Sequence, residues 1–562
     1  MFHQVTIASN NRLVRSLAAA LTIACLGCWP ASAQDNTITG IVQGESGQAV
    51  AGAFVKAANS ETGLAVMVVS RAQGRYSTPK LPPGKYTVQG FGGNNRSDVS
   101  GPIEVGSNRQ ATQDLALSVP WETAPPEKRV TDADFAKLMP PGDGKRIITS
   151  RCVFCHGLER IVPTRHTREQ WQKTVERMSG FISERTDLQK RINKGPLTDE
   201  ERSAVVDYVS TNFGKDVPRL PSENPPYDPS KHLPRTLLKG PEANYVAMEL
   251  DPRSGGRTGG KDRGTVLDVE YEIGVDSQGT AWVSGVDNEL FGHIDAKSLA
   301  FTRVVLPPGK TPRALAQIGI DPQEQVWILD NGRTPDAELL QYDPKTQKIK
   351  TYDIPAPPRF RSPLNTLRFL DGNVWGTGNS SSRLVKLDPR TGKITDYHVP
   401  GGSHPYGLTI GAGKSIWYTG MYDNEVVKFD PDTGERTPFK LSTARAAIRR
   451  IDSDADGNLW VAAQDTGKLY KLDPRTGKFT EYTPPTPHAG VYGVEVDKKR
   501  NMIWFTERDG DRIGRFDPSA NTFVEFPLPS ADTSSRRVLV DPTNSNRVWW
   551  GGTRIGYIEV ME

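Results

Sequence analysis

The stretch IWFTERDGDRIGRFDP, residues 503–518, holds two short apolar runs separated by a polar turn, with Trp504 in the first run. Weaker copies of this stretch recur through residues 232–562, and each copy has a tryptophan at the corresponding position. The tryptophans are Trp282, Trp327, Trp375, Trp417, Trp460, Trp504 and Trp549, spaced 45, 48, 42, 43, 44 and 45 residues apart. Seven copies of a strand-rich unit at this period predict a seven-bladed β-propeller.

The last copy stops about one strand after its tryptophan, at residues 557–560. A blade needs an outer strand, and the apolar run Tyr245-Val246-Ala247-Met248-Glu249-Leu250 precedes the first copy. We therefore expect residues 245–250 to complete the last blade and to close the ring from the N-terminal side.

The start of each inner strand predicts which side chains surround the mouth of the central channel, within one residue of register. The seven positions are Tyr271, Ala316, Asn365, Tyr406, Arg449, Tyr492 and Arg536. Three phenols and two guanidinium groups favour an anionic or aromatic ligand, and propeller ligands commonly bind at such a mouth. The alternative is that these are ordinary funnel residues hydrogen-bonded to water.

Cys152 and Cys155 are the only cysteines after residue 33, and His156 follows them directly. This C-x-x-C-H spacing is the attachment pattern of c-type haem, in which two thiols bind the macrocycle and the imidazole binds the iron. A zinc half-site would need a second ligand pair, and a thioredoxin-like redox pair would not need the histidine. We expect one covalent haem c, and no second cofactor is evident.

The distal iron ligand is open. Met178 is the tentative choice, because a thioether ligand suits electron transfer, but it could instead pack on the Trp171 and Val175 face of a helix. His166 is the main rival.

The sequence from 130 to 216 has helical spacing, and Thr198 followed by Glu201 forms a capping-box pattern. The frame CVFCHGLERI with its later methionine resembles a class I cytochrome c domain. That resemblance implies an all-α fold around the haem.

The N-terminus shows Arg12 and Arg15, an apolar run, and Ala31-Ser32-Ala33 before Gln34. This pattern predicts a signal peptide over 1–33 that is cleaved, and hence a periplasmic or secreted protein. Residues 36–118 alternate as a small β-sandwich, and a Pro-rich linker covers 119–129. The series GIVQGESGQAVAGAFVKA and QGRYSTPKLPPGKYTV resembles the carboxypeptidase regulatory-like domain, which implies a binding or spacer role.

The 70 basic and 66 acidic side chains nearly balance, at a formal net charge of +4. We therefore expect no nucleic-acid partner. Outside the signal, no apolar run approaches the length of a membrane span.

The repeat copy at 503–518 resembles the virginiamycin B lyase family, also called streptogramin lyases. The resemblance implies a seven-bladed propeller that opens a cyclic depsipeptide by metal-assisted elimination, with Glu507 on the family's glutamate. Tyr406 and Tyr492 stand where that family has histidines. A phenol needs a large pKa shift to act as a base near neutral pH.

The predicted fold is multidomain and mainly β: a small β-sandwich, then an all-α cytochrome c domain, then a seven-bladed β-propeller. The main functional hypothesis is an exported monohaem c-type electron-transfer protein whose propeller binds a redox partner protein or a small-molecule substrate. The alternatives are a carbon–oxygen lyase on the propeller and a non-enzymatic envelope binding protein. If the chain is an enzyme, the haem motif favours an oxidoreductase over a lyase.

Overall fold

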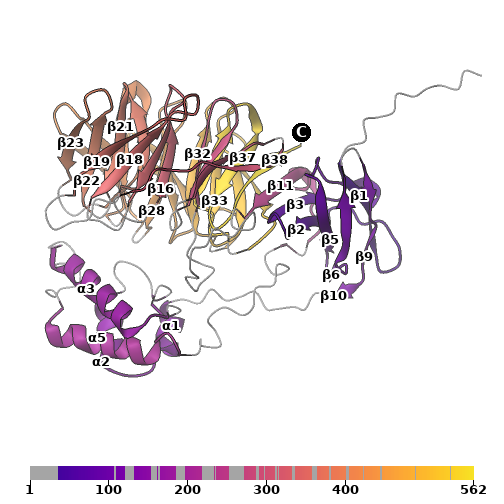
Figure 1. Cartoon of the computed structure of the whole chain (residues 1–562), viewed down its shortest axis with the longest axis horizontal. Helices are drawn as coiled ribbons and strands as arrows, with labels where there is room; N and C mark the ends of the chain where they lie inside the picture. The colour runs from indigo at the N-terminus through magenta and orange to yellow at the C-terminus, as the bar shows by residue number, and fades with distance from the viewer. Residues whose placement is uncertain are drawn as a thin grey trace, which may run out of the picture.

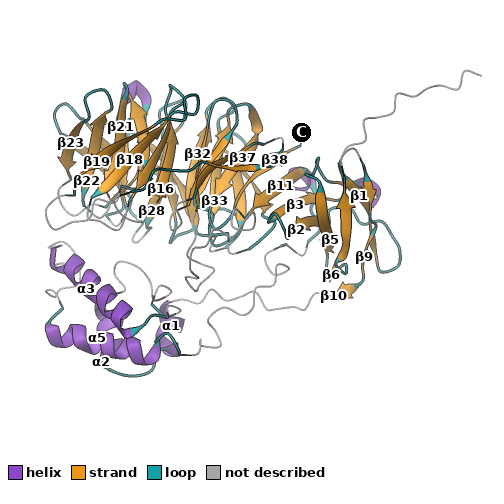
Figure 2. Cartoon of the chain, in the orientation of Figure 1, coloured by secondary structure: helices purple, strands orange, loops and turns teal. Residues whose placement is uncertain are grey.

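The computed structural model describes residues 36–561, with gaps (Figure 1). The residues outside the description are 1–35, 107–108, 121–131, 153–157, 159–160, 163–164, 185–196, 218–232, 235, 252–270, 286–289, 297, 310–312, 314, 332–335, 357–363, 379–380, 400–403, 422, 444–445, 488, 532 and 562. The predicted signal peptide therefore lies outside the described residues. Strands dominate the chain, as Figure 2 shows.

The N-terminal unit is a β-sandwich. Its strands are β1 (Ile38–Gly44), β2 (Phe54–Asn59), β3 (Leu64–Val69), β4 (Arg75–Ser77), β5 (Gly84–Gly92), β6 (Asn95–Arg96), β7 (Ser100–Val105), β8 (Ala111–Thr112), β9 (Leu115–Leu117) and β10 (Val119–Pro120). Strand β1 pairs with β4, β8 and β9, whereas β2 lies between β3 and β5. Val42, Val55 and Tyr86 are fully buried between the two layers.

Six four-stranded antiparallel sheets follow one another in sequence order. They are β12 (Tyr271–Val275), β13 (Ala281–Gly285), β14 (Phe291–Ile294) and β15 (Phe301–Arg303); β16 (Leu315–Ile320), β17 (Val326–Asp330), β18 (Ala337–Tyr342) and β19 (Ile349–Ile354); β20 (Leu367–Leu370), β21 (Asn373–Gly378), β22 (Arg383–Asp388) and β23 (Lys393–His398); β24 (Pro405–Ile410), β25 (Ile416–Gly420), β26 (Glu425–Phe429) and β27 (Arg436–Lys440); β28 (Ile448–Ser453), β29 (Leu459–Ala463), β30 (Lys468–Asp473) and β31 (Lys478–Tyr482); and β32 (Val491–Asp497), β33 (Met502–Glu507), β34 (Arg512–Asp517) and β35 (Thr522–Pro527).

The seventh sheet closes the ring. It joins β36 (Arg537–Asp541), β37 (Asn544–Gly551) and β38 (Ile555–Val560) to β11 (Tyr245–Leu250), which pairs antiparallel with β38. The prediction that residues 245–250 supply the last strand is confirmed. Strand β12 packs beside β36 and β37, and the first strands of neighbouring sheets contact one another. The first strand of each blade is therefore the innermost.

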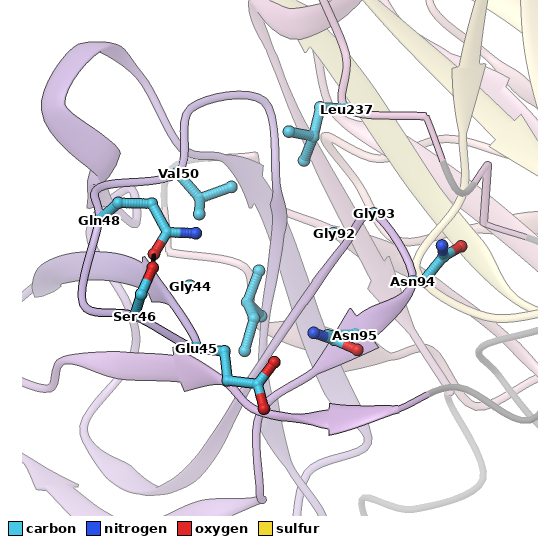
Figure 3. Close-up of a pocket in the computed structure, with 11 residues that line it drawn as sticks. Gly44, Glu45, Ser46, Gln48, Val50, Gly92, Gly93, Asn94, Asn95 and Leu237 are labelled. Carbon is cyan, nitrogen blue, oxygen red and sulfur yellow. Dashed lines mark hydrogen bonds between the residues drawn. The ribbon is translucent and has the colours of Figure 1, made fainter.

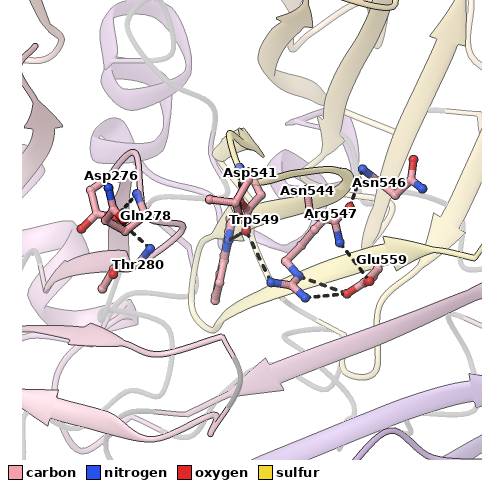
Figure 4. A network of polar contacts seen from close by, with 10 residues as sticks. Asp276, Gln278, Thr280, Asp541, Asn544, Asn546, Arg547, Trp549 and Glu559 are labelled. Atoms are coloured by element: carbon pink, nitrogen blue, oxygen red, sulfur yellow. Dashed lines mark hydrogen bonds and ion pairs between the residues drawn. The ribbon is translucent and has the colours of Figure 1, made fainter. Parts of the chain in front are cut away.

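A hydrogen bond that is buried or partly buried links a turn aspartate to the blade tryptophan in four blades. The indole Nε1 atoms of Trp282, Trp327, Trp460 and Trp549 donate to Asp276, Asp321, Asp454 and Asp541 at 2.8–3.1 Å. Figure 4 shows the bond in the last blade, beside the ion pair of Arg547 with Glu559. The repeated tryptophan thus fills the space between blades and also fastens the preceding turn.

The sandwich and the propeller share one sheet. Strand β11 pairs with β3 on one side and with β38 on the other, so the sheet runs from the sandwich into the last blade (Figure 1). Lys56 Nζ on β2 donates to the carbonyl oxygen of Pro529 in the propeller at 2.7 Å. The sandwich is therefore a continuation of the closing blade.

Between the sandwich and the propeller, the described residues contain four helices. They are α1 (Asp132–Leu138), α2 (Asp143–Ile147), α3 (Arg168–Glu184) and α5 (Asp199–Asn212), with a π-helical turn η2 (Ile148–Cys152) after α2. The predicted capping box is confirmed, because Thr198 Oγ1 accepts from the amide of Glu201 while Glu201 Oε2 accepts from that of Thr198.

The prediction of an all-α cytochrome c domain is wrong. The chain is mainly β, and the described helices are only four and short, with 7, 5, 17 and 14 residues. Caps and apolar spacing act over one or two turns, so they identify helices correctly without determining how the helices assemble.

A short 3-10 turn, η5 (Gly240–Ala243), precedes β11. In the described part of the chain, no helix is both long and apolar enough to cross a membrane.

Candidate functional site

Two tyrosines from different blades meet where the inner strands begin. Tyr406 on β24 and Tyr492 on β32 are 7% and 3% exposed, and their hydroxyl groups are hydrogen-bonded to each other. Met421 packs with both rings. The bond joins residues 86 positions apart and spans the blade between them.

Three arginines surround this pair. The guanidinium carbon of Arg449 lies 5.1 Å from the ring centre of Tyr406 and 5.3 Å from that of Tyr492. Arg450 lies 5.4 Å from the Tyr406 ring, and Arg536 lies 5.5 Å from the Tyr492 ring. We call these five residues the tyrosine–arginine cluster. At such distances guanidinium groups interact favourably with aromatic faces, and more so with a phenolate.

The two phenols have unequal acidity. Burial, with a smaller contribution from Tyr492, raises the pKa of Tyr406 to about 12 against the opposing effect of the arginines. Burial also acts to raise the pKa of Tyr492, but Arg449, Arg536 and Arg450 and the hydrogen bond with Tyr406 outweigh it. The pKa of Tyr492 is therefore lowered from its ordinary value of 10.0. Of the two hydroxyl groups, that of Tyr492 therefore loses its proton more readily.

More charged side chains come from the same inner strands. Arg450 Nη2 donates to Glu272 Oε1 on β12 at 3.2 Å, across the ring of blades. Burial and the nearby Asp452 raise the pKa of Glu495 to about 7, although Arg537, Arg368 and Lys498 oppose the rise. Burial and neighbouring arginines lower the pKa of Arg537 to about 10.

The structure brings together four of the predicted mouth residues: Tyr406, Arg449, Tyr492 and Arg536. Tyr271 and Ala316 lie elsewhere. Tyr271 is buried in the apolar cluster near β11, and Ala316 packs between blades. The main-chain carbonyl of Asn365 accepts from Arg450 Nη1 at 3.4 Å.

The sequence analysis missed Arg450 and Glu272, each one residue beyond a predicted position. The available signal was that a charged residue directly follows Tyr271 and Arg449 in the sequence.

Glu507 does not join the tyrosine–arginine cluster. It is fully buried, and burial together with the carboxylate of Glu525 on β35 raises its pKa well above the ordinary range. Glu525 itself accepts from the amide and hydroxyl of Thr486 at 2.9 and 2.6 Å. The side chain of Glu507 is thus directed toward Glu525 on the outer strand of its blade.

The haem motif is only partly described. Cys152 ends η2, is half-buried and packs against the apolar cluster of the helices. Cys155 and His156 lie outside the described residues. Met178 is half-buried on α3, and the ring of His166 makes an edge contact with Trp171 at 4.9 Å.

A hollow of about 450 Å³ lies on the sandwich between the turns at 44–50 and 92–95, with Leu237 at its edge (Figure 3). Glycine, amide and hydroxyl groups line it, with Glu45 as the charged member. It offers no pair of groups for proton transfer, so the candidate chemistry lies in the propeller. Among the described residues, no group of three or more His, Cys, Asp or Glu side chains could hold a metal ion.

Two parts of the chain match known families. Residues 305–562 match the virginiamycin B lyase family, and residues 37–118 match the carboxypeptidase regulatory-like domain. These matches agree with the predicted propeller and sandwich. The first covers less than half of the chain and so describes the propeller, not the whole protein. No curated protein matches the chain.

Solved structures resemble the propeller at low identity. Virginiamycin B lyase from Staphylococcus aureus is 22% identical, covers 53% of this chain and 97% of its own, and has a TM-score of 0.46. A streptogramin B lyase structure is 22% identical over 57% of this chain and 100% of its own, with a TM-score of 0.49. YCF48 bound to D1 peptide is 11% identical over 53% and 93%, with a TM-score of 0.42.

Proposed function

We propose that the propeller is a carbon–oxygen lyase in which Tyr492 replaces the histidine base of the lyase family. The observation that carries this proposal is the position of Tyr492, which is buried, hydrogen-bonded to Tyr406 and within 5.5 Å of two guanidinium groups. A tyrosine can act as a general base when its surroundings stabilise the phenolate. In this cluster the pKa of Tyr492 is lowered, which is the direction that a phenolic base requires.

The reaction is an elimination next to a carbonyl group. The phenolate of Tyr492 takes the proton from the carbon beside the carbonyl, the electrons of that C–H bond form a C=C bond, and the neighbouring C–O bond breaks. With an ester substrate the leaving group departs as a carboxylate, so it needs no proton. Negative charge develops on the carbonyl oxygen, and Arg449 and Arg536 are placed to stabilise it.

The metal implied by the lyase family does not fit these residues. Phenols stand at Tyr406 and Tyr492, where the family has histidines, and Glu507 is directed toward Glu525. We therefore derive no step through a metal ion and assign the charge stabilisation to the arginines.

The test is incubation with a cyclic depsipeptide of the streptogramin B class, followed by mass spectrometry. Elimination opens the ring without changing the mass, whereas hydrolysis adds one water. We expect ring opening at unchanged mass, and its loss in Tyr492→Phe. Tyr482→Phe is the matched control, because Tyr482 packs on Trp460 in an outer strand. A hydrolysed product, or equal rates for the wild type and Tyr492→Phe, would overturn the proposal.

A second candidate function rests on the C-x-x-C-H motif. We propose that Cys152 and Cys155 carry a covalent haem c, with His156 as the proximal ligand and Met178 as the tentative distal ligand. Such a group supplies one-electron transfer to a redox partner. The half-buried Cys152 beside an apolar cluster suits attachment of a large apolar ring.

Its test is the visible spectrum of protein matured in a periplasm, oxidised and reduced. A covalent haem spectrum with the absorption band of a methionine–iron bond supports Met178, and Met178→Ala should remove that band. A haem spectrum without the band would point to His166 or an open position. Absence of covalent haem would overturn both the haem and the electron-transfer proposal.

Export to the periplasm or beyond is part of the same proposal, because c-type haem is attached outside the cytoplasm. N-terminal sequencing of the mature protein tests it, and we expect the chain to begin at Gln34.

A further inference from the structure

We propose that Arg450, held by Glu272, is a positioning residue that crosses the propeller channel and sets the state of the two tyrosines. This inference rests on the proposed function only in taking Tyr492 as the general base. The juxtaposition that carries it joins three blades: β28 supplies Arg450, β12 supplies Glu272, and the residue before β20 supplies Thr366.

Hydrogen bonds to Thr366 and Glu272 hold the guanidinium group of Arg450 in place. Its Nη1 donates to Thr366 Oγ1 at 2.7 Å, and its Nη2 donates to Glu272 Oε1 at 3.2 Å. Thr366 Oγ1 in turn donates to the main-chain carbonyl of Tyr406 at 2.8 Å. Arg450 and Glu272 are 3% and 7% exposed, so both charges are shielded from solvent screening. The guanidinium therefore touches the support of Tyr406 as well as its ring.

The charges of Arg450 and Glu272 act on the phenols of Tyr406 and Tyr492. Tyr492 is faced by Arg449 and Arg450 from β28, by Tyr406 from β24, and by Arg536 from the segment before β36. Arg450 is faced by Glu272 from β12, by Arg368 from β20, by Tyr406 from β24 and by Arg537 from β36. Arg450 stabilises a phenolate, whereas Glu272 opposes it, because like charges repel.

This arrangement predicts opposite effects from the two ends of one ion pair. Arg450→Gln removes a cation and should raise the pKa of Tyr492 by about one unit. Glu272→Gln leaves the cation in place without its carboxylate and should lower the pKa of Tyr492. A merely structural role would move both variants in the same direction or would not move the pKa.

The experiment is a pH titration of full-length protein labelled with carbon-13 at tyrosine Cζ, followed by NMR. The signal of Tyr492 is the one absent from Tyr492→Phe. This readout does not require turnover, so failure of the lyase assay and failure of this inference can be told apart. Arg450→Lys keeps the cation and should titrate closer to the wild type than Arg450→Gln does.

Arg450→Gln leaves a buried carboxylate without its partner and is the variant most at risk of misfolding. The double variant Arg450→Gln/Glu272→Gln keeps the shape without either charge, and its Tyr492 should have a higher pKa than in Glu272→Gln alone. The proposed role of Arg450 is supported if the single variants shift the pKa of Tyr492 in opposite directions. It is also supported if this pKa is higher in the double variant than in Glu272→Gln. Shifts in the same direction, or no shift in any variant, would overturn it.

Discussion

The hydroxyl groups of Tyr406 and Tyr492 share a hydrogen bond across the propeller mouth. The bond lowers the pKa of Tyr492 in concert with the arginines. Tyr406→Phe removes this hydrogen bond, so the phenolate of Tyr492 loses stabilisation and its pKa rises. We expect the rise of kcat/KM with pH to move to higher pH. A pH–rate profile checks this, and a displacement to lower pH would contradict the assigned direction.

Arg449 and Arg536 should act mainly on the chemical step. Replacing both by Gln should reduce kcat/KM for the depsipeptide probe by at least about 100-fold, as loss of a charge-stabilising donor does in other enzymes. Arg515→Gln is the matched control, because this arginine lies over the ring of Trp504, 5.6 Å from its centre, outside the tyrosine–arginine cluster. Unchanged kinetics in the double variant would remove the arginines from the mechanism.

Glu495 should make stability depend on pH. Its pKa is about 7 in the folded protein and lies near 4.5 ordinarily, so the folded state binds the proton more tightly. The stabilisation is fully present below about pH 4.5 and is lost as the pH rises through 7. Glu495→Gln should flatten this dependence, which amounts to about 3 kcal/mol. Urea unfolding at about pH 5 and about pH 8 measures it, and an equal slope in both proteins would refute the assignment.

Asp454 should matter more than its place in a surface turn suggests. It is 6% exposed, and its carboxylate accepts from Trp460 Nε1 at 3.0 Å and from the amide of Asn458 at 2.8 Å. Asp454→Ala should lower the free energy of unfolding by about 3 kcal/mol, because buried donors lose their acceptor.

The matched control is Asp430→Ala. Asp430 is exposed and accepts from the amide of Asp432 at 2.8 Å, without a tryptophan partner. Asp430→Ala should lower the free energy of unfolding by less than about 1 kcal/mol. Equal losses in thermal or urea unfolding would show that the tryptophan bond adds nothing.

Gly556 should be essential for closing the ring. A Cβ atom there would overlap the carbonyl oxygen of Met248 on β11, in the pairing of β11 with β38. Gly556→Ala should lower the free energy of unfolding by at least about 2 kcal/mol and should weaken the pairing of β11 with β38. Gly274→Ala is the control, since its nearest neighbour would be the Ile320 side chain at 3.4 Å. Hydrogen exchange of β11 reports the difference, and unchanged protection in Gly556→Ala would contradict it.

The sequence alone predicted the features that repeat or act locally. The spacing of the tryptophans predicted seven sheets, because each repeat is one strand-rich unit whose apolar face needs its neighbours. The incomplete last copy identified residues 245–250 as the closing strand. The Thr198 and Glu201 pair predicted the start of α5 correctly, because a capping box lies within one helical turn.

Only the tertiary structure decided what meets across the ring. Glu272 and Arg450 are 178 residues apart, and which inner-strand residue faces the channel depends on a register that the repeat period leaves uncertain by one. The pairing of β3 with β11 was not predicted, and the predicted cytochrome c fold was wrong, for the same reason. Local patterns specify elements and burial, whereas contacts between distant elements depend on how the whole chain packs.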